Sequence, residues 1–521
     1  MSTSAPPVPV SPSPPPSVTG TGSSGTPGGQ NLRFILGLKL HQLRRKRGLS
    51  LTTLAGRAGL AVSYLNEIEK GKKYPKPEKI LALARALEVP FDDLVSLQLE
   101  EQLHPLTSLL TSGILQEIPL ELFGVTPTGL LEMMAGAPDR VSALFDTFVK
   151  IARRFDVKIE HLLLAAMRSY VEQNKNYFED LEQAVEMFRT NSGWARRPAP
   201  DLARLREHLI SAHGYVIEDD GLSRHAELAD LRAVSLDGAT PRLLLNPRLG
   251  DWQRAFILAR EIGYRQLGLR ERIHTSPHLK VESFDQLLNN FRASYFAGAL
   301  LLDRTLLVED LRAFFAQKRW DGAALVAILT KYQSTPEMFF HRLSQIVPRF
   351  FGLEQMYFLR FDHTRGTAQF RIGKELHYQR MHGTHSIGVD EHYCRRWVSL
   401  QSLAELDRRQ RDGETVAVVP GAQRAQFHQT RDTYFSMSLA YPQGLTPGED
   451  ACVTIGFLVN DALRAAVKFW DDPALPSRLV GDTCERCALT DCAERAAPPT
   501  LHEREERRTR RLAAVTALAE S

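Results

Sequence analysis

Hydrophobic residues recur at intervals of three or four positions over residues 31–97, a spacing that predicts a series of short amphipathic helices. The pattern is interrupted at Gly48, Gly59 and Gly71 and at the pair Pro75 and Pro77. Glycine and proline end helices, so these positions should separate the helices of one small all-α domain.

Changes of pattern divide the rest of the chain into further predicted domains. Residues 101–195 predict a second helical domain, whereas residues 200–345 combine one hairpin with amphipathic helices and predict an α+β domain. In residues 348–500 short runs alternate between apolar and polar positions, among them 415–419, which predicts a C-terminal α+β domain with an antiparallel sheet. Residues 501–521 have the charged pattern of a solvated terminal helix or tail.

The composition is typical of a soluble, multidomain protein. The chain has 521 residues, of which 43% are hydrophobic and 24% are charged, and one domain usually takes about 100–200 residues. No uncharged apolar run reaches the roughly 18 residues that a membrane span requires, so we expect no membrane partner. Residues 1–30 contain no charged side chain and are rich in Pro, Gly and Ser, which predicts a disordered tail rather than a secretory signal.

Positive charge is concentrated near the N-terminus. The whole chain has a net charge of +4, but residues 33–79 contain 12 Lys or Arg and three Glu, which is +9 and leaves −5 for the remainder. Clustered positive charge favours binding to nucleic acid, because the contacts with phosphate release counterions. The basic domain is therefore predicted to bind double-stranded DNA.

The same domain has the layout of a helix-turn-helix. Ser50 can cap the helix that follows it, and Gly59 permits a left-handed turn before a third helix over residues 62–70. Leu65 and Ile68 are predicted to point inward from that helix, which leaves its opposite face free to enter a major groove.

The predicted DNA-binding residues come from this free face and from the basic positions that flank it. They are Arg44, Arg45, Val62, Ser63, Asn66, Glu67, Lys70, Lys72 and Lys73. Asn66 could pair with adenine and Ser63 could contact a base or a phosphate, whereas the Arg and Lys side chains would contact phosphates.

Residues 33–95, including SYLNEIEKGKKYP, resemble the phage-repressor-type (XRE family) helix-turn-helix. The spacing of the small and apolar residues in this stretch supports the resemblance, while Leu51 stands where relatives often have Gln directed at a phosphate. The resemblance implies DNA binding. One such domain buries little surface on an operator, and two on a palindrome bind more tightly, so we expect a homodimer.

The segments WQRAFILAREIGYRQLG and SFDQLLNNFRASYFAGALLLD resemble a zinc-peptidase-like domain, whose signature is HExxH on one helix and an acidic ligand on the next. Arg260, Glu261 and Tyr264 occupy the positions of the signature, so both histidines are missing. Asn290 and Arg292 stand near the expected third ligand, and an arginine there would repel a dication. We therefore expect a degenerate domain without peptidase activity that could still hold a ligand.

Cysteines suggest a metal centre near the C-terminus. Cys484, Cys487 and Cys492 have a CxxCxxxxC spacing that can bring three thiolates to one centre, and a fourth ligand is needed. Five cysteines in all do not make a disulfide framework, which indicates a reducing compartment and predicts a cytoplasmic protein. Zinc and iron–sulfur clusters both accept four thiolates, so the residues alone leave open an iron–sulfur cluster, a structural zinc ion or reduced thiols without a metal.

Taken together, the three features resemble the short-chain fatty acyl transcriptional regulator family across most of residues 33–500, including AMRSYVEQNKNYFEDLEQA in the middle. The resemblance implies a regulator, not an enzyme, that controls propionate/methylcitrate or glyoxylate metabolism and responds to a small-molecule acyl-CoA. It also implies an iron–sulfur cluster of the 4Fe–4S type, with Cys394 as the fourth ligand beside Cys484, Cys487 and Cys492.

Three alternatives remain open at this point. His392 could replace Cys394 in a Cys3His zinc site. The chain could be a redox-responsive repressor that uses no small-molecule effector. A metallopeptidase is a further alternative, against which the missing histidines argue directly.

Overall fold

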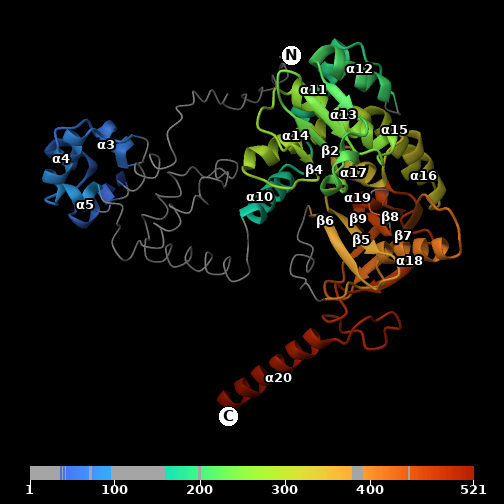
Figure 1. Cartoon of the computed structure of the whole chain (residues 1–521). Helices are drawn as coiled ribbons and strands as arrows, with labels where there is room; N and C mark the ends of the chain where they lie inside the picture. The colour runs from blue at the N-terminus through green and yellow to red at the C-terminus, as the bar shows by residue number, and fades with distance from the viewer. Residues whose placement is uncertain are drawn as a thin grey trace, which may run out of the picture. The chain divides into compact units, whose positions relative to one another are not determined.

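The computed structural model describes residues 36–37, 39–41, 43–69, 73–95, 159–197, 201–377, 391–443, 446 and 448–520 (Figure 1). The chain divides into two compact units, Met1–Lys158 and Ile159–Ser521, which we describe separately. The predicted tail, the predicted helical segment up to residue 158, and Lys70 and Lys72 lie outside the described residues.

The described part of the first unit is all-α, as predicted. Its helices are α2 (Leu51–Arg57), α3 (Val62–Glu69), α4 (Pro77–Ala86) and α5 (Phe91–Val95), and the described residues between 36 and 46 are mostly helical as well. One core joins all of these helices, and its buried side chains include Leu40, Leu54, Leu65, Ile68 and Leu83.

Local signals in the sequence explain where α2 and α3 begin and how they cross. The Ser50 hydroxyl accepts a hydrogen bond from the Thr53 N–H at 3.0 Å and so caps α2. Gly59 has a φ of +65°, the left-handed conformation that the turn requires. At Gly37 an added Cβ would lie 2.5 Å from the Ile68 carbonyl oxygen. Only glycine therefore lets the helical residues between 36 and 46 approach the end of α3.

The second unit combines helices with two sheets. Its helices are α10 (Ile159–Gln173), α11 (Glu179–Asn191), α12 (Leu202–His213), α13 (Asp251–Gln266), α14 (Phe284–Leu301), α15 (Arg304–Phe315), α16 (Gly322–Lys331), α17 (Pro336–Phe351), α18 (Val398–Arg411), α19 (Asp461–Ala466) and α20 (Thr500–Glu520). Two short 3-10 helices lie at Gly221–Arg224 and Ala226–Leu228.

The smaller sheet has the order β1-β3-β2-β4, from β1 (Val216–Glu218), β2 (Ala233–Leu236), β3 (Arg242–Leu245) and β4 (Thr275–Ser276). The pair β2–β3 forms the predicted hairpin. Strand β1 pairs parallel with β3.

The larger sheet has the order β10-β7-β8-β9-β5-β6, from β5 (Met356–Thr364), β6 (Phe370–His377), β7 (Val419–Phe427), β8 (Thr433–Pro442), β9 (Glu449–Leu458) and β10 (Ser477–Val480). All of its pairs are antiparallel except β10–β7, so the predicted antiparallel sheet gains one parallel edge strand. The predicted strand 415–419 is misplaced, because β7 begins only at Val419 and its Pro, Gly, Gln and Arg residues interrupt the alternating pattern.

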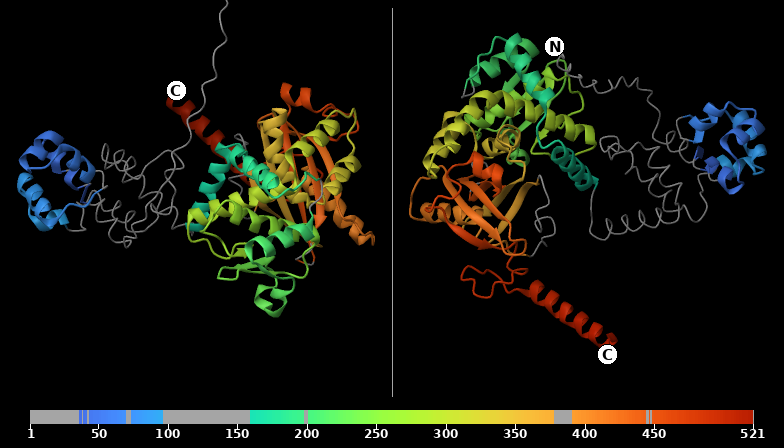
Figure 2. Two further views of the ribbon diagram at one scale, coloured as in Figure 1. Left: turned by 90° about the horizontal axis from the view of Figure 1, so that it is seen from above. Right: turned by 180° about the vertical axis from the view of Figure 1, so that it is seen from behind.

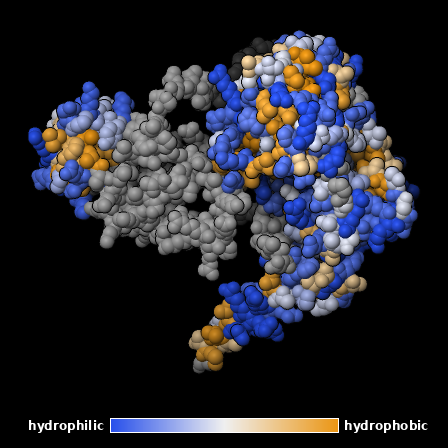
Figure 3. All heavy atoms as spheres, viewed as in Figure 1, coloured by the Kyte–Doolittle hydropathy of each residue, from blue (hydrophilic) through white to orange (hydrophobic). Residues whose placement is uncertain are grey.

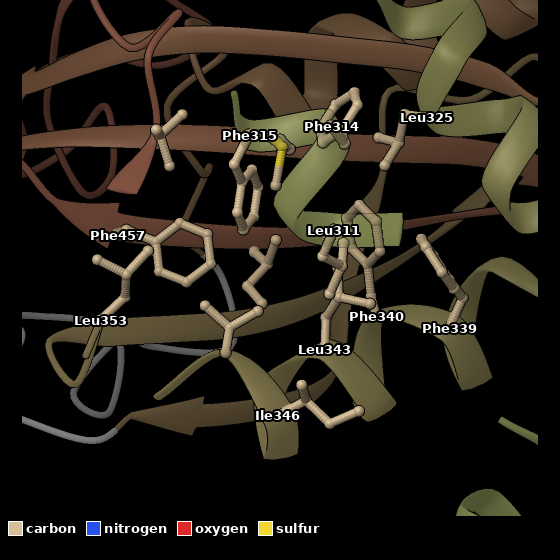
Figure 4. Close-up of a cluster of buried hydrophobic side chains, with 14 of the residues drawn as sticks. Leu311, Phe314, Phe315, Leu325, Phe339, Phe340, Leu343, Ile346, Leu353 and Phe457 are labelled. Carbon is tan, nitrogen blue, oxygen red and sulfur yellow. The ribbon is translucent and has the colours of Figure 1, made fainter. Parts of the chain in front are cut away.

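Helices cover both faces of the larger sheet (Figure 2). Phe314 of α15, Phe340 of α17, and Phe435 and Phe457 of the sheet belong to one buried cluster on the first face (Figure 4). On the other face, residues of α18 such as Leu403 pack in a second cluster. The predicted boundary between residues 345 and 348 therefore crosses a shared core.

Helix α11 likewise packs against α14, through a third cluster that includes Phe188 and Phe296. The segment 159–195, predicted to belong to a separate helical domain, is thus part of the second unit. Periodicity shows that a helix has an apolar face but does not show which partner covers it, and this explains the difference.

The terminal segment forms helix α20, in agreement with the charged helical pattern. Its first half is hydrophilic, whereas its second half exposes Leu512, Val515 and Leu518 (Figure 3). Among the described helices of the chain, none is long and apolar enough to cross a membrane.

A buried ion pair ties α11 to α17. The Glu182 and Arg342 side chains are 4% and 1% exposed, and the guanidinium donates to both carboxylate oxygens at 2.6 and 3.0 Å. Tyr295 donates a further hydrogen bond to Glu182 at 2.8 Å, and the Arg342 Nε–H donates to the Leu302 carbonyl.

We expect Glu182→Ala to lower the free energy of unfolding by about 3–5 kcal/mol, because it leaves a buried guanidinium without its counter-ion. Glu186→Ala on the same helix is the matched control, since its partner Arg196 is 48% exposed and such pairs contribute about 0–1 kcal/mol. Urea unfolding of the full chain, followed by tryptophan fluorescence, measures both. Equal effects of the two substitutions would contradict this account.

Candidate functional site

The predicted base-reading residues lie on the face of α3 that points away from the core. Val62 is 40% exposed and Ser63 is also exposed, whereas Asn66 and Glu67 are half-buried. Leu65 and Ile68, which were predicted to point inward, are fully buried. The geometry of α3 is therefore that of a helix with a free polar face.

Arg44 does not lie with this set, although it was predicted to contact phosphate. Its guanidinium donates to the two Glu69 carboxylate oxygens at 2.7 and 2.8 Å and to the Leu49 carbonyl at 3.0 Å. The two side chains are only 13% and 5% exposed. Arg44 thus links the helical residues between 36 and 46 to α3. Its neighbour Arg45 is exposed.

Lys73, the described member of the predicted Lys70, Lys72 and Lys73 group, forms an exposed ion pair with Glu67 at 2.8 Å. Its ammonium group also lies 5.7 Å from the centre of the Tyr64 ring. Lys73 and Glu67 both belong to the predicted DNA-binding set, so a phosphate that binds Lys73 would have to compete with the Glu67 carboxylate.

Two segments that lie far apart in the sequence meet at the cysteine centre. The N–H of Cys394 donates to the Asp482 carbonyl at 3.0 Å, and the N–H of Cys484 donates to the His392 carbonyl at 2.8 Å. These backbone bonds hold the two segments side by side directly after β10 ends.

As a result, all four predicted ligands line one small cavity. They are Cys394, Cys484, Cys487 and Cys492, of which the first three are buried and the last is half-buried. Burial raises the pKa of the Cys394 thiol to about 11, and the neighbouring Cys484 and Cys487 contribute to the rise. The fifth cysteine, Cys452, is fully buried in β9, as expected for a small core residue.

Arg495 shapes the loop that carries three of these cysteines. Its guanidinium donates to the carbonyls of Cys484 at 2.7 Å and Cys487 at 3.2 Å, and also to that of Leu489. The N–H of Ala496 donates to the Cys484 sulfur at 3.3 Å, the type of bond that tunes thiolate ligands. Sequence reasoning missed this role of Arg495, because its partners are backbone atoms and no sequence pattern signals them.

His392, the alternative zinc ligand, is hydrogen-bonded to Glu485. Its Nδ1 lies 2.7 Å from a Glu485 carboxylate oxygen, and its backbone N–H donates to the same carboxylate at 3.0 Å. It does not line the cavity, whereas Cys394 does. Within the described ranges, no group of three or more His, Cys, Asp or Glu side chains is arranged to hold a single metal ion.

In the degenerate peptidase-like site, charged side chains of the chain itself pair with one another. Glu261 is fully buried and accepts hydrogen bonds from Arg272 at 2.7 and 2.9 Å and from the Tyr215 hydroxyl at 3.1 Å. Burial raises the pKa of Glu261, but the Arg272 charge and hydrogen bond outweigh this and hold it below its ordinary value. A carboxylate held in this way is a poor general base.

The positions of the missing metal ligands also have new partners. The Tyr264 hydroxyl donates to the Asn290 amide oxygen at 3.2 Å, and the Arg272 guanidinium lies 4.2 Å from the centre of the Tyr264 ring. Arg260 is buried and has one long hydrogen bond, to Ser276 at 3.5 Å. Arg292, also predicted near this site, pairs with Asp180 instead.

Comparison with known proteins identifies two domains of the chain. Residues 40–94 match the helix-turn-helix family, and residues 221–344 match the IrrE N-terminal-like domain family. The HTH-type transcriptional regulator RamB of Mycobacterium tuberculosis (strain ATCC 25618 / H37Rv) is 24% identical over 490 residues, which cover 89% of this chain and 94% of RamB. The HTH-type transcriptional regulator PrpR of the same strain is 25% identical over 497 residues, which cover 89% of this chain and 92% of PrpR.

A shorter relative matches the first unit. The uncharacterized HTH-type transcriptional regulator y4dJ of Sinorhizobium fredii (strain NBRC 101917 / NGR234) is 32% identical over 66 residues, which cover 13% of this chain and 86% of y4dJ. The chain belongs to the helix-turn-helix transcriptional regulators that carry an IrrE-like domain. The predicted family is thereby confirmed, and the regulator's IrrE-like segment includes the buried Glu261–Arg272 pair.

The regulator's Arg44–Glu69 pair predicts a dependence of stability on pH. Burial raises the pKa of Glu69, but the hydrogen bonds and charges of Arg44 and His41 outweigh it and hold this pKa below its ordinary value of 4.5. A carboxylate whose folded pKa is depressed stabilises the fold above about pH 4.5, and this contribution disappears as the pH falls through the folded pKa.

We therefore expect Glu69→Gln to destabilise the first unit by about 2 kcal/mol at pH 7 and to make its acid unfolding less steep, because hydrogen bonds to charged groups contribute about 1.5–3 kcal/mol. Scanning calorimetry of the full chain at pH 7 and below pH 4 measures this. Glu67→Gln on the same helix is the control, since its pair with Lys73 is exposed and should contribute little.

Proposed function

We propose that this regulator binds an operator as a homodimer in the cytoplasm, controls short-chain fatty acid metabolism of the propionate/methylcitrate or glyoxylate type, and responds to an acyl-CoA. We further propose that it carries an iron–sulfur cluster, and that it is not an enzyme. The observation that carries the proposal is the convergence of four cysteine thiols on one cavity in a chain that also has a helix-turn-helix unit.

The donor set fits a cluster. Cys394, Cys484, Cys487 and Cys492 would hold it, and such a group supplies one-electron redox chemistry or a structural link between the segments. Four thiolates around one zinc ion lie roughly 3.8 Å apart, since Zn–S bonds are about 2.3 Å long. A cluster of several irons spreads its ligands more widely, and the family resemblance favours the cluster.

The charges around the cavity support the same choice. Arg395, Arg396 and Arg495 line it together with one carboxylate, that of Glu494. A 4Fe–4S cluster with four thiolate ligands carries net negative charge, so a lining with an excess of arginines stabilises it. Glu494 is in turn paired with Arg478 at 2.7 Å, which offsets its charge.

The effector would act by stabilising one arrangement of the two DNA-binding units over another, because a ligand shifts an equilibrium only through its different affinity for two states. Within a dimer the spacing of the two α3 helices decides whether both reach the major groove. The buried Glu261–Arg272 pair argues against a peptidase role for the IrrE-like domain.

A second candidate is a redox-responsive repressor without a small-molecule effector. Cys492 is the one half-buried member of the four cysteines, so an oxidant could reach the centre at that side. In that case air exposure would change DNA binding and acyl-CoA would not.

Replacing Cys487 with Ser should abolish the visible absorption of anaerobically purified protein and lower its iron content, because one of four ligands is lost. Cys452→Ala is the matched control, since this cysteine lies in the core of β9 and should leave the spectrum unchanged. Absorption spectroscopy and iron analysis decide between the outcomes. Unchanged colour and iron in Cys487→Ser would show that these cysteines are not the ligands.

Fluorescence anisotropy on the chain's own upstream DNA, at fixed salt, tests the regulatory proposal. We expect acetyl-CoA or propionyl-CoA, but not free CoA, to change the Kd about tenfold, which is 1.4 kcal/mol of coupling. Asn66→Ala should weaken binding to this DNA more than to random DNA, whereas Arg45→Ala should weaken both about equally. Tight, specific binding that no thioester alters would contradict the effector and favour the redox-responsive alternative.

A further inference from the structure

A cavity of about 510 Å³ lies at one end of the larger sheet, beside the turn that joins β7 to β8. Three arginines line it: Arg424 from β7, Arg431 from the turn and Arg464 from α19. Asp432 is the single carboxylate of the lining. The charged groups therefore give the cavity a net charge of about +2, which favours an anion.

Among these three arginines, Arg464 alone forms an ion pair within the described residues. In the part of the chain that the structure describes, neither Arg424 nor Arg431 forms a direct ion pair, although the charge of Arg424 contributes, after backbone hydrogen bonds, to the lowered pKa of Asp472. The buried Nε of Arg424 has no hydrogen-bond partner. Arg464 pairs with Asp461 at 3.0 Å, but the two side chains are 52% and 99% exposed. An exposed pair of this kind contributes little and can be exchanged for a ligand.

The rest of the lining combines the polar residues Thr433 and Ser477 with an apolar and aromatic wall. Leu458, Val459 and Trp470 contribute to the lining, and the Arg464 guanidinium lies 5.4 Å from the centre of the Trp470 ring. Arginine forks bind phosphate oxygens in pairs, and an aromatic wall suits a flat ring. The volume falls within the range of about 300–1,000 Å³ that is typical of small-molecule sites.

We infer that this cavity binds a phosphate-bearing ligand of the nucleotide class, with its phosphates at Arg424, Arg431 and Arg464 and its base against the apolar wall. Coenzyme A also contains a phosphorylated adenosine diphosphate, so free nucleotides and CoA thioesters share the recognised chemistry. The inference does not depend on the proposed acyl-CoA response, because arginine recognises the phosphates and not the acyl group.

The cavity shares its supports with the cysteine centre. Strand β10 begins at Ser477, which lines the cavity, and leads directly into the cysteine loop. The turn that contains Arg431 also contains His428, whose ring nitrogen accepts a hydrogen bond from the Ala488 N–H at 3.4 Å. A ligand in the cavity therefore contacts the turn and the strand that support this loop.

Isothermal titration of the full chain with ADP, with CoA and with inorganic phosphate tests the inference. We expect ADP and CoA to bind saturably with a Kd below about 1 mM and phosphate to bind more weakly, because it lacks the base. The double substitution R431Q/R464Q should weaken the binding of both ligands at least tenfold. Arg411→Gln is the matched control, because Arg411 is an exposed arginine in an i,i+4 pair on α18, away from the cavity.

Circular dichroism and thermal melting establish that each variant is folded. No saturable binding of ADP or CoA to the wild-type chain, or equal affinities of the wild type and R431Q/R464Q, would overturn the inference. Binding that the double substitution abolishes supports the site even if no thioester changes DNA affinity, so this site and the proposed effector response can fail separately. Loss of CoA binding alone, with ADP unaffected, would also overturn it.

Discussion

The larger sheet of the second unit has two apolar faces, and both must be covered. On one face Phe435 and Phe457 pack with Phe314 and Phe340 of the helices α15 and α17 (Figure 4). On the other face α18 packs through residues such as Leu403. Burial of apolar surface is the main source of stability. Helices α15 and α17 therefore share one core with the sheet, although the sequence pattern suggested two separate domains.

This arrangement also positions the features that carry chemistry. Strand β10 is held at the edge of the sheet by its parallel pairing with β7, and the cysteine loop follows its last residue. Helix α18 begins directly after the segment that carries Cys394. The two halves of the cysteine centre are therefore brought together by the sheet and its covering helix, and Arg495 then ties the loop to itself.

Buried arginines perform a second common task in this chain. Arg272 neutralises Glu261 where a metal-dependent peptidase would have a dication, and Arg342 neutralises Glu182 between two helices. Each guanidinium has bidentate or multiple hydrogen bonds, which a buried charge requires. By contrast, Arg424, Arg431 and Arg464 line a cavity at the end of the sheet, where their charges can bind an anion. The same residue type thus stabilises the interior and offers an anion site at the edge.

The local features of the chain could be read from a few neighbouring residues. Ser50, Gly59 and the inward positions of Leu65 and Ile68 were predictable, because caps, left-handed turns and helical periodicity depend on a few neighbouring residues. The missing histidines beside Glu261 and the spacing of Cys484, Cys487 and Cys492 were equally visible. The resemblance to a family identified Cys394 as the fourth predicted ligand.

Which of these residues meet depends on long-range packing. It placed Arg44 on Glu69 instead of on a free face, paired Glu261 with Arg272, and removed the expected boundaries near residues 195 and 345. A charge or an apolar face in the sequence has many possible partners. The choice among them is made by the packing of the whole unit, which no short window of sequence contains.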